Sequence, residues 1–349
     1  MIDAIHTLFH VDAQRSPCFI VAEISANHNQ SIEHAENIIR AAAEAGADAI
    51  KLQTYTADTL TIPCDNNYFR VSHPIWKGKT LYELYREAYT PWEWHPRLMQ
   101  LAADLGLVCF STPFDATAVD FLETLAVPCH KVASFEIVDI PLLKKIAATE
   151  KPVIMSTGMA SLSEIDEAVR TLRENGTSDL VLLKCTSAYP APVEEMNLRT
   201  IPHLARTFAC RAGLSDHTLG SIIPIAAVAL GACLVEKHVT LSRADGGPDA
   251  AFSLEPHELK QMVRDIRDTE AALGAISYGT TEKEQNSQVF RRSLFVVSDM
   301  RKGDIFTADN VRSIRPGHGL HTRHYDAVLG RSAKRDIKKG TPLAWADCD

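Results

Sequence analysis

The sequence predicts an α/β fold, a parallel (β/α)8 (TIM) barrel followed by a small, mostly β domain. Eight short apolar runs alternate with amphipathic segments, and from about residue 290 the pattern changes to short strands and turns. The length of 349 residues agrees with two domains, because a single hydrophobic core rarely exceeds about 250 to 300 residues.

The strand candidates are short apolar runs of the length typical of buried strands. They are CFIVAEI (18–24), ADAIKLQ (47–53), LGLVCFST (105–112), PCHKVAS (128–134), KPVIMST (151–157), DLVLLKCTS (179–187), RAGLSD (211–216) and ACLVEKH (232–238). Their regular alternation with helices favours a closed barrel over an open, doubly wound sheet. A Rossmann sheet is the alternative, but no G-x-G-x-x-G follows the first strand.

The intervening segments have apolar residues three and four positions apart, which is the period of an amphipathic helix. The clearest are SIEHAENIIRAAAEAGA, TAVDFLETLA, SLSEIDEAVRTLRENG and LGSIIPIAAVALGA, several with glycine close to the end, where helices commonly stop. PHELKQMVRDIRDTEAALG follows the eighth run. It predicts the eighth helix of the barrel.

Residues 54–90 interrupt the alternation. This segment is rich in tyrosine and contains Trp76. It is far longer than an ordinary βα loop of about 2 to 6 residues. We expect it to form a lid or a loop that contacts a partner.

The last part of the chain predicts a compact second domain. The polar segment SYGTTEKEQNSQ indicates a linker. After it, DMRKGDIFT and DIKKGTPL form a weak internal repeat among short strands and turns. The predicted boundaries are 1–275 for the barrel, 276–289 for the linker and 290–349 for the β domain.

Composition argues against several classes of protein. The chain has 46% hydrophobic and 23% charged residues and a net charge of −8, so nothing indicates binding to nucleic acid. No apolar stretch approaches the ~18 residues of a membrane span, and no signal peptide is evident. The eight cysteines form no C-x-x-C motif and four of them, Cys109, Cys129, Cys185 and Cys233, lie in apolar runs. They indicate small buried residues in a reducing compartment, and we expect a cytoplasmic protein.

Polar residues close the apolar runs, beginning with AEISANHNQ at 22–30. In a (β/α)8 barrel the active site lies where the strands end, so these residues should face one pocket. They are Glu23, Lys51, Gln53, Thr112, Lys131, Ser134, Glu136, Ser156, Ser187, Tyr189, Ser215, His217, Glu236 and His238. Two lysines among several hydroxyls would bind a phosphate and a carboxylate together.

Each of these residue types also has a simpler interpretation. A strand-end lysine often extends to solvent, a serine or threonine often caps the next helix, and a histidine often has a structural role. Alternatively, His217 and His238 together would hold a divalent cation completed by oxygen ligands. That arrangement suits Mn²⁺ better than a closed zinc site.

The chain resembles the sialic acid synthase family from about residue 17 to residue 345. The motifs that match in order and spacing are AEISANHNQ, GADAIKLQTY, STPFD, KVASFE, MSTGM, LKCTSAYP, GLSDHT, EKHVT and RPGHGL. The resemblance implies an N-terminal barrel and a C-terminal antifreeze-like (SAF, β-clip) domain. It also implies condensation of phosphoenolpyruvate with an acylated amino sugar.

Within that family, several local motifs are most similar to the branch that makes pseudaminic acid. They are ISANH, QTYTADTLT, LYELYREAYTPWEWH, ASFE in place of GSGE, and CTSAYP in place of CTN-x-YP. This implies 2,4-diacetamido-2,4,6-trideoxy-L-altrose as the sugar. The branches that make N-acetylneuraminate or legionaminic acid are the alternatives.

The resemblance also implies roles for individual residues. The positions that match phosphoenolpyruvate contacts are Lys51, Thr112, Lys131, Ser134, Ser156, Ser187, where the sialic enzymes have asparagine, and Ser215. The positions that match sugar contacts are Glu23, Gln53, Tyr189, Asp249 and Arg315. His217 and His238 match the metal pair, with Mn²⁺ expected and Mg²⁺ or Co²⁺ as alternatives. Because the matching arginine acts in the partner subunit's barrel, the resemblance implies a domain-swapped homodimer.

The implied chemistry requires a base for the water that adds to C2 of phosphoenolpyruvate before phosphate leaves by C–O cleavage. Glu136, close to the two lysines, is our hypothesis for this base. The expected catalytic set is therefore Glu23, Glu136, His217 and His238. Two other functions stay open. One is a barrel aldolase with Lys51 or Lys131 as a Schiff base, and the other is a non-catalytic scaffold whose C-terminal domain binds glycan.

Overall fold

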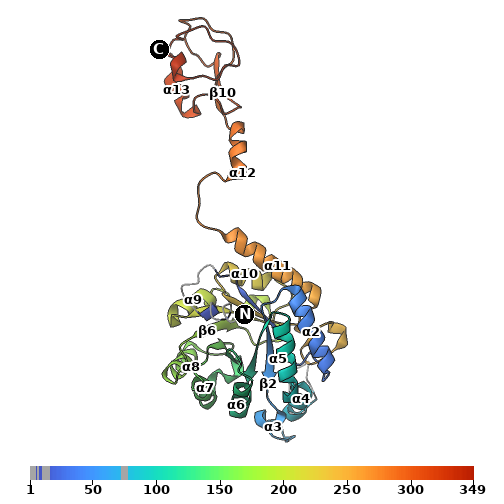
Figure 1. Cartoon of the computed structure of the whole chain (residues 1–349). Helices are drawn as coiled ribbons and strands as arrows, with labels where there is room; N and C mark the ends of the chain where they lie inside the picture. Colours follow the sequence, from blue (N-terminus) through green and yellow to red (C-terminus); the bar gives the residue numbers. More distant parts are fainter. Residues whose placement is uncertain (1–4, 6–7, 10–15, 72–77) are drawn as a thin grey trace. The chain divides into compact units, whose positions relative to one another are not determined.

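The computed structural model describes residues 5, 8–9, 16–71 and 78–349. Trp76 of the insertion lies outside these residues. The chain divides into two compact units, Met1–Gly274 and Ala275–Asp349 (Figure 1). In the described part of the chain, no helix is long and apolar enough to cross a membrane.

The first unit is a closed barrel of eight parallel strands, as the sequence predicted. The strands are β1 (Phe19–Glu23), β2 (Ala49–Thr54), β3 (Val108–Pro113), β4 (His130–Val132), β5 (Val153–Ser156), β6 (Leu180–Cys185), β7 (Arg211–Asp216) and β8 (Leu234–His238). The barrel closes where β8 pairs with β1, in a register that sets Glu23 opposite His238. The alternative of an open Rossmann sheet is therefore excluded.

Helices surround the strands (Figure 1). They are α2 (Ile32–Ala45), α5 (His95–Asp104), α6 (Ala116–Thr124), α7 (Ile140–Ala147), α8 (Leu162–Glu174), α9 (Thr200–Phe208), α10 (Ile222–Ala229) and α11 (Pro256–Leu273). The expected local signals define their ends. The Ser31 hydroxyl accepts a hydrogen bond from the backbone N–H of His34 at the start of α2, and Gly46, with φ of 87°, ends that helix.

Alternation along each strand separates the barrel interior from the helix layer. On β8, Leu234 packs inside with Phe110 and Ile154. Val235 packs instead with the residues of the surrounding helices. The same period of two turns Glu236 and His238 toward the barrel interior, so this strand delivers polar groups above an apolar floor.

The insertion after β2 contains two short helices, α3 (Ala57–Leu60) and α4 (Leu81–Ala88). The side-chain amide of Gln30 donates hydrogen bonds to the carbonyls of Glu87, at 2.9 Å, and Tyr89, at 2.7 Å. The Tyr82 hydroxyl donates to Asp58, at 3.0 Å. Both ends of α4 are thereby tied to neighbouring segments, and its role as lid or partner contact stays a prediction.

The second unit contains α12 (Glu282–Gln285), η7 (Asn286–Phe290), the antiparallel pair β9 (Ser293–Val296) and β10 (Val311–Ile314), and α13 (Tyr325–Val328). The predicted internal repeat is present as two mutually bonded loops. Asp299 accepts a hydrogen bond from the backbone N–H of Lys339, and Asp336 accepts one from Lys302, each at 2.8 Å. Residues 300 and 337 exchange backbone hydrogen bonds between the loops.

Candidate active site

A cavity of about 570 Å³ opens at the carboxyl ends of the barrel strands. It brings together most of the predicted site residues. They are Lys51, Gln53, Lys131, Ser134, Glu136, Ser156, Tyr189, Ser215, His217, His238 and Asp249. The expectation that the strand ends converge on one pocket is thereby confirmed for these residues.

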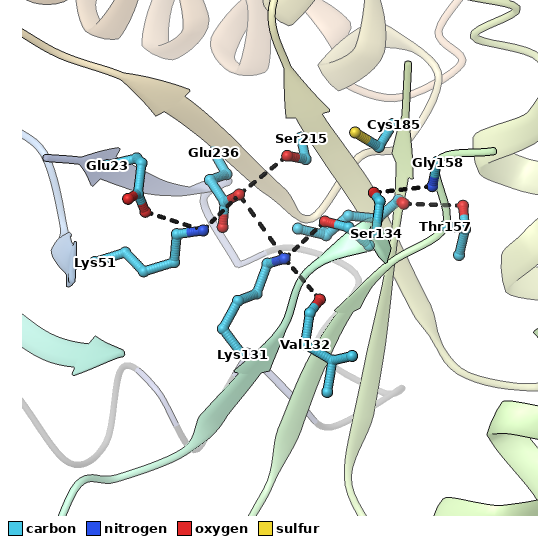
Figure 2. A network of polar contacts seen from close by, with 12 residues as sticks. Glu23, Lys51, Lys131, Val132, Ser134, Thr157, Gly158, Cys185, Ser215 and Glu236 are labelled. Carbon is cyan, nitrogen blue, oxygen red and sulfur yellow. Dashed lines mark hydrogen bonds and ion pairs between the residues drawn. The ribbon is translucent and has the colours of Figure 1, made fainter. Parts of the chain in front are cut away.

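A buried ion-pair network occupies the base of the cavity (Figure 2). The Lys51 ammonium lies 2.9 Å from Glu23 Oε2 and 3.0 Å from Glu236 Oε1. Burial lowers the pKa of Lys51 to about 8, against the opposing effect of Glu236. Burial would raise the pKa of Glu236, but Lys131 and Lys51 hold it at about 2. Glu236 therefore stays ionised.

Lys131 approaches the same carboxylate from β4. Its ammonium donates hydrogen bonds to Ser156 Oγ, at 2.7 Å, and to the carbonyl of Val132, at 2.9 Å, and it lies 3.9 Å from Glu236 Oε1. The Ser215 hydroxyl donates to Glu236 at 3.0 Å. Two ammonium groups and the Ser215 hydroxyl thus surround one carboxylate, and the lysines are buried and do not extend to solvent.

A close approach of backbone and hydroxyls lies beside the lysines. The backbone N–H of Gly158 donates to Ser134 Oγ at 3.1 Å. A Cβ at Gly158 would lie only 2.3 Å from Ser187 Oγ and 2.7 Å from Ser134 Oγ. A larger residue at position 158 would have to displace these two hydroxyls. Because Ser156 also lines the cavity, the STG sequence at 156–158 belongs to the site and is more than a helix cap.

The two predicted metal ligands end neighbouring strands. The ring centroids of His217 and His238 are 5.3 Å apart. His217 Nδ1 lies 3.0 Å from the carbonyl of Thr186, whereas the buried Nδ1 of His238 has no hydrogen-bond partner. Burial, with the charge of His217, holds the pKa of His238 well below its ordinary value, so its imidazole is neutral.

Two imidazoles, one neutral and with an unpartnered nitrogen, fit a divalent cation whose other ligands are water and substrate oxygens. Within the described ranges, no group of three or more His, Cys, Asp and Glu residues is arranged to hold a metal. The protein would thus supply few ligands, which leaves positions open for substrate.

Glu136 lies in η3 (Ser134–Val138), directly after β4. Its Oε2 is buried without a hydrogen-bond partner. Burial raises the pKa of Glu136 to about 7, while Lys131 and Lys51 act in the opposite direction. A carboxyl group with a pKa near neutrality suits general acid–base catalysis.

Several of the predicted sugar contacts lie in a second polar group of the cavity. Gln53 donates to Ser25 Oγ at 2.9 Å, and the Ser25 hydroxyl donates to Asp249. Burial raises the pKa of Asp249. The ring of Tyr189 lies 4.5 Å from that of His217. These groups form a polar cluster that extends from β1 to the segment after β8.

Four predicted residues do not line the cavity. Glu23 lies behind Lys51 as its ion-pair partner. Thr112 is buried near the end of β3 with an unpartnered hydroxyl, and Ser187 lies next to Gly158. Arg315 belongs to the second unit and follows β10.

Sequence reasoning assigned no role to Glu236 and treated Cys185 only as a small buried residue. Glu236 is two positions before His238 on a buried strand, which was the available signal. Cys185 does line the cavity, with its sulfur 3.8 Å from His217 Nδ1. Cys185 is buried, as predicted; although burial raises the pKa of this thiol, His217 and neighbouring hydroxyls bring it down to about 7.

The chain is similar to proteins of known activity. It is 43% identical to the pseudaminic acid synthase of Helicobacter pylori over 95% of this chain and 98% of that protein. It is 44% identical to the pseudaminic acid synthase of Campylobacter jejuni over 94% of this chain and 96% of that one. The N,N'-diacetyllegionaminic acid synthase of Legionella pneumophila is 37% identical over 94% of each chain.

The fold is also similar to that of a solved structure. The crystal structure of the spore coat polysaccharide biosynthesis protein SpsE of Bacillus subtilis matches with a TM-score of 0.64 and 36% identity over 95% of each chain. The SAF domain model matches residues 291–348, and the NeuB family model matches residues 38–278. The chain therefore belongs to the NeuB family, which confirms the resemblance to sialic acid synthases.

Proposed function

We propose that this protein is a transferase that condenses phosphoenolpyruvate with 2,4-diacetamido-2,4,6-trideoxy-L-altrose to give pseudaminic acid and phosphate. The relatives at 43% and 44% identity support the choice of product. One observation supports the chemistry above the others: two buried lysines stand among hydroxyls at one side of a cavity that also holds two histidines and Glu136.

The lysine side of the cavity suits phosphoenolpyruvate. Lys51 and Lys131 offer charged donors, and Ser134, Ser156 and Ser215 offer hydroxyls in the same cavity. Charge-assisted hydrogen bonds to phosphate and carboxylate oxygens are stronger than neutral ones. Because Glu23 and Glu236 already hold Lys51 in place, little side-chain freedom is lost when the substrate binds.

In the proposed reaction, C3 of phosphoenolpyruvate forms a bond to the aldehyde carbon of the open-chain sugar, the aldehyde oxygen takes the C=O electron pair and then a proton from solvent, and C2 becomes electrophilic. Water then adds at C2, and the tetrahedral intermediate breaks its C2–O bond to release phosphate. Glu136 takes the proton from that water. Its buried carboxyl, with a pKa near 7, is matched to proton transfer at neutral pH.

His217 and His238 would hold a divalent cation, with Mn²⁺ expected and Mg²⁺ or Co²⁺ as alternatives. When bound, the cation supplies positive charge that polarises the aldehyde oxygen. The neutral imidazole of His238 is the form that binds a metal. Phe252 packs 5.1 Å from the His238 ring and holds it in place.

A Schiff-base aldolase has one feature in its favour, since burial brings the pKa of Lys51 to about 8. Its two carboxylate partners, however, stabilise the ammonium form, which is not nucleophilic. Borohydride treatment in the presence of substrate would trap an imine on Lys51 or Lys131. The proposed synthase gives no such adduct.

We also propose that the protein forms a domain-swapped homodimer in which Arg315 reaches the partner's cavity. We further propose that it acts in the cytoplasm. Exposed apolar residues on the loops after β4, β5 and β7 support a covered surface at this end of the barrel; they are Phe135, Val138, Met159, Leu162, Leu219 and Ile222. The cysteines, all free thiols, support a reducing compartment. Light scattering of the purified chain tests the dimer. A monomer at micromolar concentration would contradict it.

The deciding experiment measures phosphate release from phosphoenolpyruvate with Mn²⁺, with the altrose sugar and with N-acetylmannosamine, each beside a sample treated with chelator. Release with the altrose sugar alone is expected. Release with N-acetylmannosamine instead would leave the family assignment intact and would change the sugar that we assign as substrate. Release with neither would lead next to the precursor of legionaminic acid, as the 37% identical relative suggests.

A further inference from the structure

One wall of the cavity is apolar and comes mainly from the insertion after β2. Its lining residues include Leu60 at the end of α3 and Leu81, Leu84 and Ala88 on α4, together with Phe114 beyond β3. The same cavity is also lined by lysines, histidines and carboxylates. The cavity therefore combines polar groups that suit acid–base chemistry with a group of aliphatic side chains from the insertion.

The apolar wall is built in place. Tyr55 is buried, and its ring meets Tyr85 edge-on at 5.9 Å and Phe114 at 5.1 Å, so α4 packs against the ends of β2 and β3. The Thr80 hydroxyl caps the first turn of α4 at 3.2 Å from the N–H of Glu83. Gln30 holds the carbonyls at the other end, as described above. A wall fixed at both ends is a preformed contact surface for a ligand.

Arg70, Tyr68 and Tyr85 also line the cavity and are the polar exceptions within the insertion. The Nε of Arg70 donates to the carbonyl of Asp65 at 2.8 Å, and its guanidinium lies 3.7 Å from the Asp65 carboxylate. Arg70 thus has an acidic partner within the insertion. The leucines and Ala88 remain as the part of this wall that offers no hydrogen bond.

We propose that this wall binds the C6 methyl group of the sugar and makes the enzyme selective for 6-deoxy sugars. The inference rests on the proposed function, which sets the aldehyde at the histidines and phosphoenolpyruvate at the lysines. The far end of the sugar is then left for the aliphatic side chains of the insertion. A C6 hydroxyl placed there loses its hydrogen bonds to water and gains none from Leu60 or Leu81, so it is disfavoured.

The test compares two substrates, the 6-deoxy altrose sugar and its analogue with a hydroxyl at C6, at saturating phosphoenolpyruvate and Mn²⁺. The wild-type protein should have a kcat/KM about 10- to 200-fold higher for the 6-deoxy sugar, the range of discrimination that one small group provides in an apolar pocket. Leu60→Asn and, separately, Leu81→Asn should reduce that ratio at least fivefold, by analogy with the same range. The added amide supplies a partner for the hydroxyl. The KM for phosphoenolpyruvate should not change.

Leu105→Asn is the matched control, because Leu105 is 37% exposed at the end of α5 and does not line the cavity. It should leave the ratio unchanged. Equal kcat/KM for the two sugars in the wild type would overturn this inference while the proposed function stands. The same follows if both leucine variants fold, as circular dichroism reports, and keep the wild-type ratio. Absence of turnover with the 6-deoxy sugar in the wild type would instead overturn the proposed function and this inference with it.

Discussion

Glu136→Gln removes an ionisable group that the folded protein keeps away from water. Burial raises the pKa of Glu136 from its ordinary value of 4.5 to about 7. Between these two values the folded protein holds a proton that the unfolded chain has released. The free energy of unfolding of the wild type therefore falls as pH rises through this window. Glutamine has no proton to release and is free of this loss.

The size of the effect follows from the two pKa values. Their difference of roughly 2.5, at 1.36 kcal/mol for each, corresponds to about 3 kcal/mol. At pH 8, Glu136→Gln should be more stable than the wild type by about that amount. At about pH 3 and below, where the carboxyl is protonated in both the folded and the unfolded state, the two proteins should have equal stability. Urea unfolding of the whole chain, followed by circular dichroism at each pH, measures both quantities.

The same substitution that raises stability is expected to lower the catalytic rate. Glu136→Gln should bind phosphoenolpyruvate normally and lose turnover, and the wild-type rate should rise through about pH 7 as the carboxylate forms. Glu44→Gln, on the exposed face of α2, is the control and should change neither property. Equal stability of Glu136→Gln and wild type at pH 8 would refute the raised pKa of the Glu136 carboxyl. Unchanged turnover would remove Glu136 from the mechanism.

Three further changes test other parts of the barrel. Gly158→Ala should raise the dissociation constant for phosphoenolpyruvate in calorimetry, because the methyl would displace the Ser187 and Ser134 hydroxyls, which lie 2.3 Å and 2.7 Å from its position; unchanged affinity would place the anion elsewhere. Lys237→Met leaves Asp216, 2.6 Å from the lysine ammonium, buried without its partner. The cost should be about 3 to 5 kcal/mol in urea unfolding, and a smaller loss would mean that water reaches the carboxylate. His238→Ala should abolish the Mn²⁺ binding seen by electron paramagnetic resonance, whereas retained binding would exclude the histidine pair.

The fold was predictable because local pattern and global packing agree. The barrel strands are buried on both faces, so the chain shows apolar runs that become polar where the strands end, and the covering helices are amphipathic. The strand ends were equally visible, since polar residues such as Lys51 and Lys131 break those runs. Knowing that parallel strands end at one side of a barrel was enough to gather them into one cavity.

What the sequence could not predict depends on contacts between distant segments. Glu236 becomes the partner of Lys51 only because β8 closes onto β1, with Glu23 opposite His238. The lowered pKa of the Cys185 thiol likewise depends on its contact with His217, which follows the next strand of the barrel. The insertion was recognisable by its length, but its attachment through Gln30 follows from side-chain geometry that no periodicity records.

The charge balance of the cavity limits how it binds an anion. Lys51 and Lys131 face Glu23 and Glu236, so the four formal charges cancel. Because the lysines hold the pKa of Glu236 at about 2, the site cannot become more positive by taking up a proton there at neutral pH. Affinity for phosphoenolpyruvate must then come from directed donors and from charge brought in with a cation. In the proposed function, a cation at the histidines supplies that charge, which makes substrate binding and metal binding interdependent.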